Sequence, residues 1–105
     1  MKNLGDMMKQ ARELQSKMEQ LQTELETLEV QGSAGGGMVH VTMTGKGEVK
    51  KVSIDPSLMK EDEREILEDL VVAAAADAKG KAERAAQEKM KALTGGLQLP
   101  PGLGL

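Results

Sequence analysis

The strongest constraint on the fold is a run of apolar residues near the amino terminus that recurs every three or four positions. The apolar residues alternate between the a and d positions of a heptad: Leu4, Met7, Ala11, Leu14, Met18, Leu21, Leu25 and Leu28. This spacing predicts an amphipathic helix over about residues 4–28. At 1.5 Å per residue the helix would be roughly 40 Å long, which exceeds the diameter of a compact domain of this size. We therefore expect the helix to project and its apolar face to need a partner helix.

A change of period marks the end of this helix and the start of a small sheet. Four glycines between residues 32 and 37 are unfavourable in a helix. After them, Val39, Val41 and Met43 alternate with polar residues, which predicts a strand. The Gly45-Lys46-Gly47 segment suits a tight turn into a second strand that ends at Ile54.

Two further details of the sheet are expected. The apolar positions of the second strand change parity near Lys50 and Lys51, which predicts a β-bulge or a strong twist there. A glycine-rich edge strand over residues 29–33 would give a sheet of three strands rather than two. A small sheet with an open edge is poorly buried in a monomer of this length, so we expect a homodimer.

A second long helix is expected over about residues 61–93. Asp55 and Pro56 have the pattern of a helix cap followed by a first-turn proline, and acidic residues gather near the helix start, where the helix dipole favours them. Its apolar face is rich in alanine, and small residues there could receive the Leu and Met side chains of the first helix. The two helices would then pack antiparallel, so that the start of the first and the end of the second share one distal end. The fold class is α+β, with residues 1–94 as one α-β-α domain and residues 95–105 as a flexible Gly/Pro/Leu tail.

The composition excludes most enzymatic chemistry. The chain has no Cys and a single His, His40, so neither a thiol nucleophile nor a His cluster can be assembled within one chain. We expect no enzyme activity, cofactor, metal site or small-molecule substrate. No signal peptide or membrane span is recognisable, so a cytoplasmic location without a membrane partner is expected.

Charge is unevenly distributed, although the net charge is −3. Basic residues outnumber acidic ones in residues 1–18 and 79–91, and acidic residues dominate in residues 19–29 and 55–69. Separated basic segments suit contacts with DNA phosphates, whereas the alternative is that they are only the solvated faces of long helices. The candidate phosphate contacts are Lys2, Lys9, Arg12, Lys17, Lys79, Lys81, Arg84, Lys89 and Lys91, with Lys46, Lys50 and Lys51 as second choices.

Base-specific recognition is not expected. Phe, Tyr and Trp are absent, so no aromatic ring can stack on unpaired bases. Arginine is scarce and no helix-turn-helix pattern is recognisable, which argues against direct readout of base edges. If the chain binds DNA, contacts to the backbone should dominate.

Five ordered blocks of the chain resemble the YbaB/EbfC family of bacterial nucleoid-associated proteins. The blocks are Asn3-Leu4-Gly5-Asp6-Met7-Met8-Lys9-Gln10-Ala11, Gly35-Gly36-Gly37-Met38-Val39-His40-Val41-Thr42-Met43-Thr44-Gly45, Ile54-Asp55-Pro56-Ser57-Leu58, Leu67-Glu68-Asp69-Leu70 and Met90-Lys91-Ala92-Leu93-Thr94-Gly95-Gly96-Leu97 with Pro100-Pro101-Gly102. Ala76, Ala92 and Gln98 depart from the family pattern. The resemblance implies a non-enzymatic, cytoplasmic homodimer of tweezer-like shape that binds double-stranded DNA and associates with the nucleoid.

Two other functions remain open at this stage. A helix, β-hairpin and helix with a coiled-coil face also resemble a prefoldin subunit in outline, and such a chaperone would use Met7, Met8 and Met90 to hold unfolded chains. An adaptor of DNA replication or recombination proteins would instead use the apolar segment 97–105 as a docking peptide.

Overall fold

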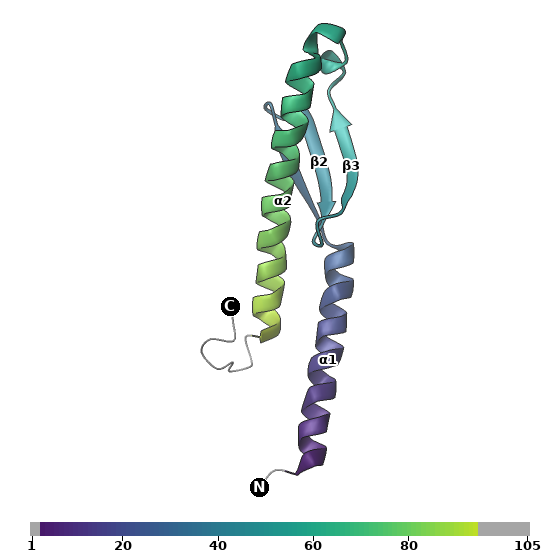
Figure 1. The fold of residues 1–105 in the computed structure, drawn as a ribbon, viewed down its shortest axis with the longest axis vertical. Coiled ribbons are helices and arrows are strands. Elements are labelled where there is room, and N and C mark those ends of the chain that lie inside the picture. Colours follow the sequence, from purple (N-terminus) through teal and green to yellow (C-terminus); the bar gives the residue numbers. More distant parts are fainter. Residues whose placement is uncertain (1–2, 95–105) are drawn as a thin grey trace.

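The computed structural model describes residues 3–94, which form a long helix, a three-stranded sheet and a second long helix (Figure 1). The elements are α1 (Leu4–Thr27), β1 (Glu29–Ala34), β2 (Val39–Thr44), β3 (Val49–Ile54), the short 3-10 helices η1 (Pro56–Leu58) and η2 (Glu61–Glu63), and α2 (Arg64–Thr94). The molecule is elongated, measuring 73 × 25 × 15 Å along its principal axes. This order confirms the α+β fold and both predicted helices.

Helix α1 begins and ends where the sequence predicts. The Asn3 Oδ1 atom accepts a hydrogen bond from the Asp6 amide at 2.8 Å and caps the first turn. At the other end the Leu28 amide donates to the Glu24 carbonyl at 2.9 Å, and the backbone then becomes extended. The heptad positions from Leu4 to Leu25 therefore occupy one unbroken helix, and Leu28 is its C-cap.

The sheet is antiparallel, in the order β1-β2-β3, so the third strand expected at residues 29–33 is present. Thr42 pairs with Lys51 while Met43 pairs with Val49, which leaves Lys50 as the extra residue of a bulge at the predicted position. Gly47 has a φ of 90° in the turn between β2 and β3, a conformation that favours glycine.

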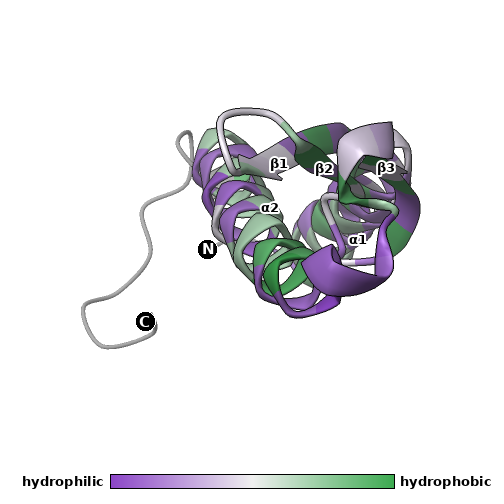
Figure 2. Cartoon of the chain, turned by 90° about the horizontal axis from the view of Figure 1, so that it is seen from above, coloured by the Kyte–Doolittle hydropathy of each residue, from purple (hydrophilic) through white to green (hydrophobic). Residues whose placement is uncertain are grey.

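Helix α2 packs against one face of this sheet, over β1 and β2. Viewed down the long axis, the strands form one layer with α2 on one side of it, beside β1 (Figure 2). The buried core joins Val39, Val41, Met43 and Leu58 to the alanines Ala74, Ala78 and Ala82. The expectation that the alanine face of α2 receives the side chains of α1 holds only near the carboxyl end of α2, where Ala85 lines a groove with Leu21; Ala74, Ala78 and Ala82 pack on the sheet instead.

The reason for this packing is the absence of side-chain bulk on both sides of the contact. A methyl group added at Gly32 of β1 would collide with the backbone nitrogen of Ala78 and the carbonyl oxygen of Ala74. The backbones of α2 and β1 approach so closely because glycine faces alanine there. The helix is thus held on the sheet rather than on α1.

Helix α1 contacts α2 only near its carboxyl end. Leu21 and Leu25 are 3% and 8% exposed, whereas Leu4 at the other end of the same heptad is 70% exposed. The two helices do extend toward the same end of the molecule, but α2 stops beside the middle of α1 (Figure 1). The amino-terminal half of α1 therefore projects alone. Within residues 3–94, neither helix combines the length and the apolar character needed to cross a membrane.

Candidate nucleic-acid interface

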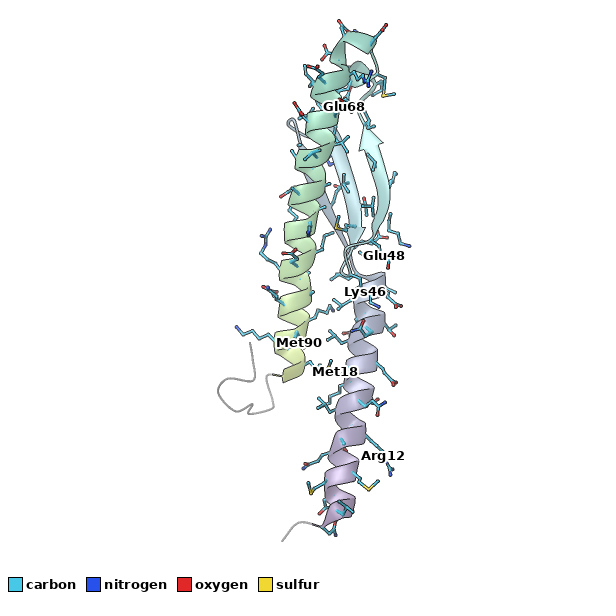
Figure 3. The ribbon with its side chains drawn as sticks, viewed as in Figure 1. Arg12, Met18, Lys46, Glu48, Glu68 and Met90 are labelled. Atoms are coloured by element: carbon cyan, nitrogen blue, oxygen red, sulfur yellow. The ribbon has the colours of Figure 1, made fainter. Side chains whose placement is uncertain are left out.

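The projecting half of α1 carries two exposed cations, Lys9 and Arg12. In the heptad they take the f and b positions, away from the apolar a and d positions. Arg12 points away from the side on which α2 lies, whereas Met18 lies level with Met90 of α2 (Figure 3). These two cations are free to meet a phosphate backbone without disturbing the apolar face.

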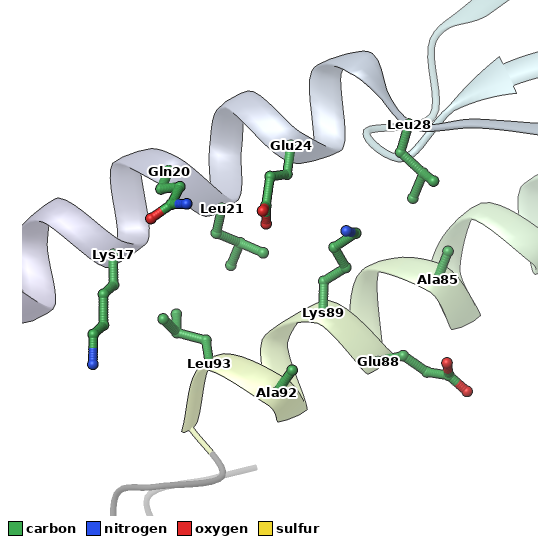
Figure 4. A pocket seen from close by; sticks show the side chains of 10 residues that line it. All are labelled: Lys17, Gln20, Leu21, Glu24, Leu28, Ala85, Glu88, Lys89, Ala92 and Leu93. Carbon is green, nitrogen blue, oxygen red and sulfur yellow. The ribbon is translucent and has the colours of Figure 1, made fainter.

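A groove between α1 and α2 holds two more of the predicted cations. Its volume is about 690 Å³, and it is lined by Lys17, Gln20, Leu21, Glu24, Leu28, Ala85, Glu88, Lys89, Ala92 and Leu93 (Figure 4). Lys89 extends from α2 toward α1, while Glu24 approaches from the opposite wall (Figure 4). Because two lysines share the groove with two glutamates, the groove is close to neutral. We expect anions to meet the outer rims of the helices rather than the interior of the groove.

Lys81 lies beside the sheet, not at the distal end where we expected it. Its Nζ atom donates to the Gln31 carbonyl at 3.0 Å and lies 3.2 Å from Asp77 Oδ2. Asp77 Oδ2 in turn accepts a hydrogen bond from the Ser33 amide at 3.0 Å. Asp77 and Lys81 thus provide hydrogen-bond partners for the Ser33 amide and the Gln31 carbonyl on the outer edge of β1. Lys81 therefore holds α2 on the sheet and is not available to a ligand.

The same contacts change the acidity of Asp77. The amide of Ser33, and after it the Lys81 ammonium group, stabilise the ionised carboxylate and lower the pKa of Asp77 below its ordinary value of 3.8. Asp55 shows a related effect, because the Ser57 amide donates to its carboxylate at 2.8 Å and lowers its pKa. Both aspartates therefore serve local structure.

The remaining predicted cations are distributed over three elements. Lys79 and Arg84 are exposed on α2, with Lys79 next to the Ala78 contact and so beside the sheet rather than at the distal end. Lys91 is exposed in the last turn of α2. Lys2 lies outside the described residues. Among the second choices, Lys46 pairs with Glu26 at 2.9 Å, and Lys50 and Lys51 are exposed on β3.

The basic and acidic segments lie at different positions along the long axis. Arg12 lies near one end, and Glu68 near the other, where α2 begins (Figure 3). Acidic residues dominate segment 55–69 at that end, whereas Lys9 and Arg12 lie on the projecting half of α1 at the opposite end. Within residues 3–94 no three His, Cys, Asp or Glu side chains are grouped so as to hold a metal ion.

Sequence reasoning missed the role of Asp77 as the partner of Lys81. The signal was available, because Asp77 and Lys81 are four residues apart beside the alanine face, and such pairs meet on one side of a helix. What the spacing could not show is that both residues reach the edge of β1.

Comparison with known proteins agrees with this architecture. The family model described as the YbaB/EbfC DNA-binding family matches residues 1–97. A nucleoid-associated protein of Nitrobacter hamburgensis is 71% identical over 99 residues, which cover 94% of this chain and 93% of the relative. A nucleoid-associated protein of Nitrobacter winogradskyi is 69% identical over 98 residues, covering 93% and 92% of the two chains.

One solved structure shows the same fold. The crystal structure of an uncharacterized protein from Helicobacter pylori superposes with a TM-score of 0.68 at 23% identity, covering 90% of this chain and 95% of that chain. At this identity the likeness concerns the fold alone. On the family match and the two close relatives, this chain belongs to the YbaB/EbfC DNA-binding family.

Proposed function

We propose that this protein is a nucleoid-associated homodimer that binds double-stranded DNA mainly through phosphates, with little sequence specificity and without catalysis. The observation that supports this proposal most is the placement of exposed Lys9, Arg12 and Arg84 on two rigid helices, separated from the acidic end of the chain. The family and the names of the close relatives support DNA and the nucleoid as the target.

The character of the available side chains favours contacts to phosphate over contacts to bases. Lysine and arginine neutralise phosphates and release counterions irrespective of sequence. No aromatic side chain exists to stack on a base or to wedge between base pairs. Contacts of this kind position a protein on a duplex but carry no information about sequence.

The predicted contacts do not all carry equal weight. Lys9, Arg12, Arg84 and Lys91 are exposed on the helices and carry the proposed phosphate contacts, whereas Lys17 and Lys89 share the groove with Glu24 and Glu88 and are weaker candidates. Lys81 is engaged with Asp77 and Gln31, and we assign it a structural role. Lys2 remains a candidate beyond the described residues.

A second candidate function is suggested by the exposed apolar side of α1. Leu4, Met7 and Leu14 are exposed large hydrophobic residues on a projecting helix. A prefoldin-like chaperone, or an adaptor of DNA replication or recombination proteins, could present such a surface to a protein partner. The adaptor segment expected at residues 97–105 lies outside the described residues.

The test is fluorescence anisotropy of two unrelated labelled duplexes, titrated at several salt concentrations. We expect both duplexes to bind alike, and the logarithm of affinity to fall linearly with the logarithm of salt concentration. A double variant, Arg12→Glu with Arg84→Glu, should weaken binding of both duplexes by about tenfold or more and reduce the salt slope by about 0.9 for each contact removed.

The control is the double variant Lys60→Glu with Arg64→Glu, which changes the net charge by the same amount at the acidic end of the molecule. Both residues are exposed, so the control should bind DNA nearly as the parent protein does. Equal losses of DNA affinity in the two double variants would show that binding depends only on net charge and not on the position of the cations. Absence of binding to either duplex at low salt would favour the chaperone or adaptor function.

A further inference from the structure

The carboxyl end of α1 lies against the turn that joins β2 to β3, residues 44–48, which we call the β2–β3 turn (Figure 1). The Gly45 amide donates hydrogen bonds to the carbonyls of Leu25 and Leu28, both at 3.0 Å. Leu25 belongs to the last turn of α1, where carbonyl groups have no partner within the helix. A residue of the hairpin, distant in sequence, therefore caps the carboxyl end of α1.

Two further contacts join the same turn to the same helix end. The Nζ atom of Lys46 lies 2.9 Å from Oε1 of Glu26, and a cation near the carboxyl end of a helix is favoured by the helix dipole. This ion pair is partly exposed and adds little stability by itself. A methyl group at Gly45 would lie 3.0 Å from both the Leu25 carbonyl and its Cδ2 atom, and 3.2 Å from Leu28 Cδ2. The turn thus fits the end of α1 closely.

Thr44 fixes the shape of the β2–β3 turn. The residue is 1% exposed, and its Oγ1 atom accepts hydrogen bonds from the amides of Lys46 and Glu48, both at 3.2 Å. Its backbone carbonyl accepts a hydrogen bond from the Gly47 amide at 2.9 Å, and its amide donates to the Glu48 carbonyl at 2.8 Å. These four bonds hold Gly45 and Lys46 in place against α1.

The covalent connection between α1 and the sheet does not fix the direction of α1 by itself. A single residue, Leu28, separates α1 from β1, and rotation about its φ and ψ angles would redirect the whole helix. Besides the turn, α1 is supported by α2 near Leu21. Both supports lie within the last two turns of α1, so the rest of the helix acts as a lever.

The length of this lever makes its direction important for DNA binding. Lys9 precedes Glu26 by 17 residues, which is about 26 Å at 1.5 Å per residue. A change of about 10° in the direction of α1 would displace Lys9 by about 4.5 Å, more than the rise of about 3.4 Å per phosphate along one DNA strand. Lys9 and Arg12 can meet phosphates together with Arg84 of α2 only while α1 keeps its direction.

We propose that the β2–β3 turn positions α1 for DNA binding, and that Thr44, Gly45 and Lys46 are positioning residues that do not contact DNA. The proposal rests on the proposed function and adds what holds its phosphate contacts in place. A helix that has one direction before binding avoids the entropic cost of being ordered on binding. Changes in the turn should therefore weaken DNA binding without removing a phosphate contact.

The first measurement is the direction of α1 in the absence of DNA. Because the chain has no cysteine, spin labels can be attached at Asp6→Cys on α1 and Gln87→Cys on α2, both at exposed positions. The labelled chain is diluted into an excess of unlabelled chain, so that double electron–electron resonance reports the distance within one chain. We expect one narrow distance distribution in the parent protein, and a broadened or displaced one in Thr44→Val and in Gly45→Ala.

Thr42→Val is the matched control. It makes the same chemical change as Thr44→Val two residues earlier in β2, away from the turn, and its distance distribution should equal that of the parent protein. An unchanged distribution in both Thr44→Val and Gly45→Ala would overturn the proposal. An equal broadening in Thr42→Val would also overturn it, because the effect would then come from a general loosening of the sheet.

The second measurement is duplex binding by fluorescence anisotropy at several salt concentrations. Thr44→Val should weaken binding by about threefold to tenfold through the added ordering cost. The slope of the logarithm of affinity against the logarithm of salt concentration should stay unchanged, because no cation is lost. A Thr44→Val protein with a broadened distance distribution but the DNA affinity of the parent protein would contradict the proposal.

A charge exchange tests Lys46 and guards against misfolding. Lys46→Glu alone places two carboxylates side by side and should broaden the distance distribution. Lys46→Glu combined with Glu26→Lys restores the ion pair at unchanged net charge, and should restore both the narrow distribution and the DNA affinity of the parent protein. An affinity that stayed low in the exchanged variant would identify Lys46 as a phosphate contact and reject its positioning role.

Failure of the positioning role and failure of the DNA-binding function are distinguishable, because the distance measurement needs no DNA. If the parent protein bound neither duplex, the proposed function would fail, and the distance distributions would still decide whether the turn holds α1. If the parent protein bound DNA and the turn variants kept its distance distribution, the positioning role would be rejected and the proposed function would stand.

Discussion

The two long helices carry the same kind of periodic apolar face, yet they are packed in different ways. The face of α2 is built of alanines and lies directly on the backbone of β1 at Gly32. The face of α1 is built of leucine and methionine, and only its last two turns are covered within the chain. Periodicity therefore shows which face of a helix is buried, while side-chain volume decides how closely a neighbour can approach.

The largest expected loss of stability follows from disturbing the contact between the alanine face of α2 and β1. Gly32→Ala would force a methyl group against the backbone of α2 at Ala74 and Ala78, neither of which can move alone. We expect a loss of about 3 kcal/mol in the free energy of unfolding, measured by urea denaturation. Gly36→Ala has open space around it and a positive φ, so it should lose only about 1 kcal/mol. Equal losses would mean that the close approach does not hold α2 in place.

A smaller loss of stability is expected in α1, where it should differ between the buried and the exposed part of the heptad. Leu21→Ala removes a side chain that is buried against α2 and should cost about 2–3 kcal/mol. Leu14→Ala removes the same atoms from an exposed position of the same heptad and should cost less than about 1 kcal/mol when the protein is dilute enough to be monomeric. The measurement is urea denaturation at two protein concentrations. A large loss of unfolding free energy for Leu14→Ala in the monomer would show that Leu14 is already covered within one chain.

The smallest effect concerns the link between α2 and β1. The Asp77 carboxylate is stabilised in the folded state, which puts its folded pKa below the unfolded value of 3.8. Its contribution to stability is therefore complete above that value and is lost as the pH falls through the folded pKa. Asp77→Asn should lower the melting temperature at pH 7, and the gap from the parent protein should narrow below about pH 4.

A matched variant makes this last measurement specific. Asp69→Asn removes one negative charge from an exposed position of α2, and the melting temperatures of both variants are compared with that of the parent protein at pH 7 and below pH 4. If the two variants behaved alike, the contacts of Asp77 with Ser33 and Lys81 would have no measurable role.

Local features of the fold were predictable because each depends on residues close together in the sequence. The heptad, the alternation of valines in β2 and the parity change at Lys50 predicted a helix, a strand and a bulge, and all three are present. The candidate site was predictable only in part. Basic residues could be counted, but Lys81 was assigned to the distal end although it lies beside β1.

The sequence by itself determined the order and extent of the elements, the aliphatic core and the separation of basic from acidic segments. These follow from backbone preferences and side-chain patterns that act over a few residues. Only the tertiary structure decided that most of α2 lies on β1 and β2, which left the amino-terminal part of the α1 heptad exposed. This packing depends on the fit of Gly32 against Ala74 and Ala78, which are more than forty positions further along the chain. A periodic pattern identifies the small residues of a helix face but does not show which distant backbone they contact.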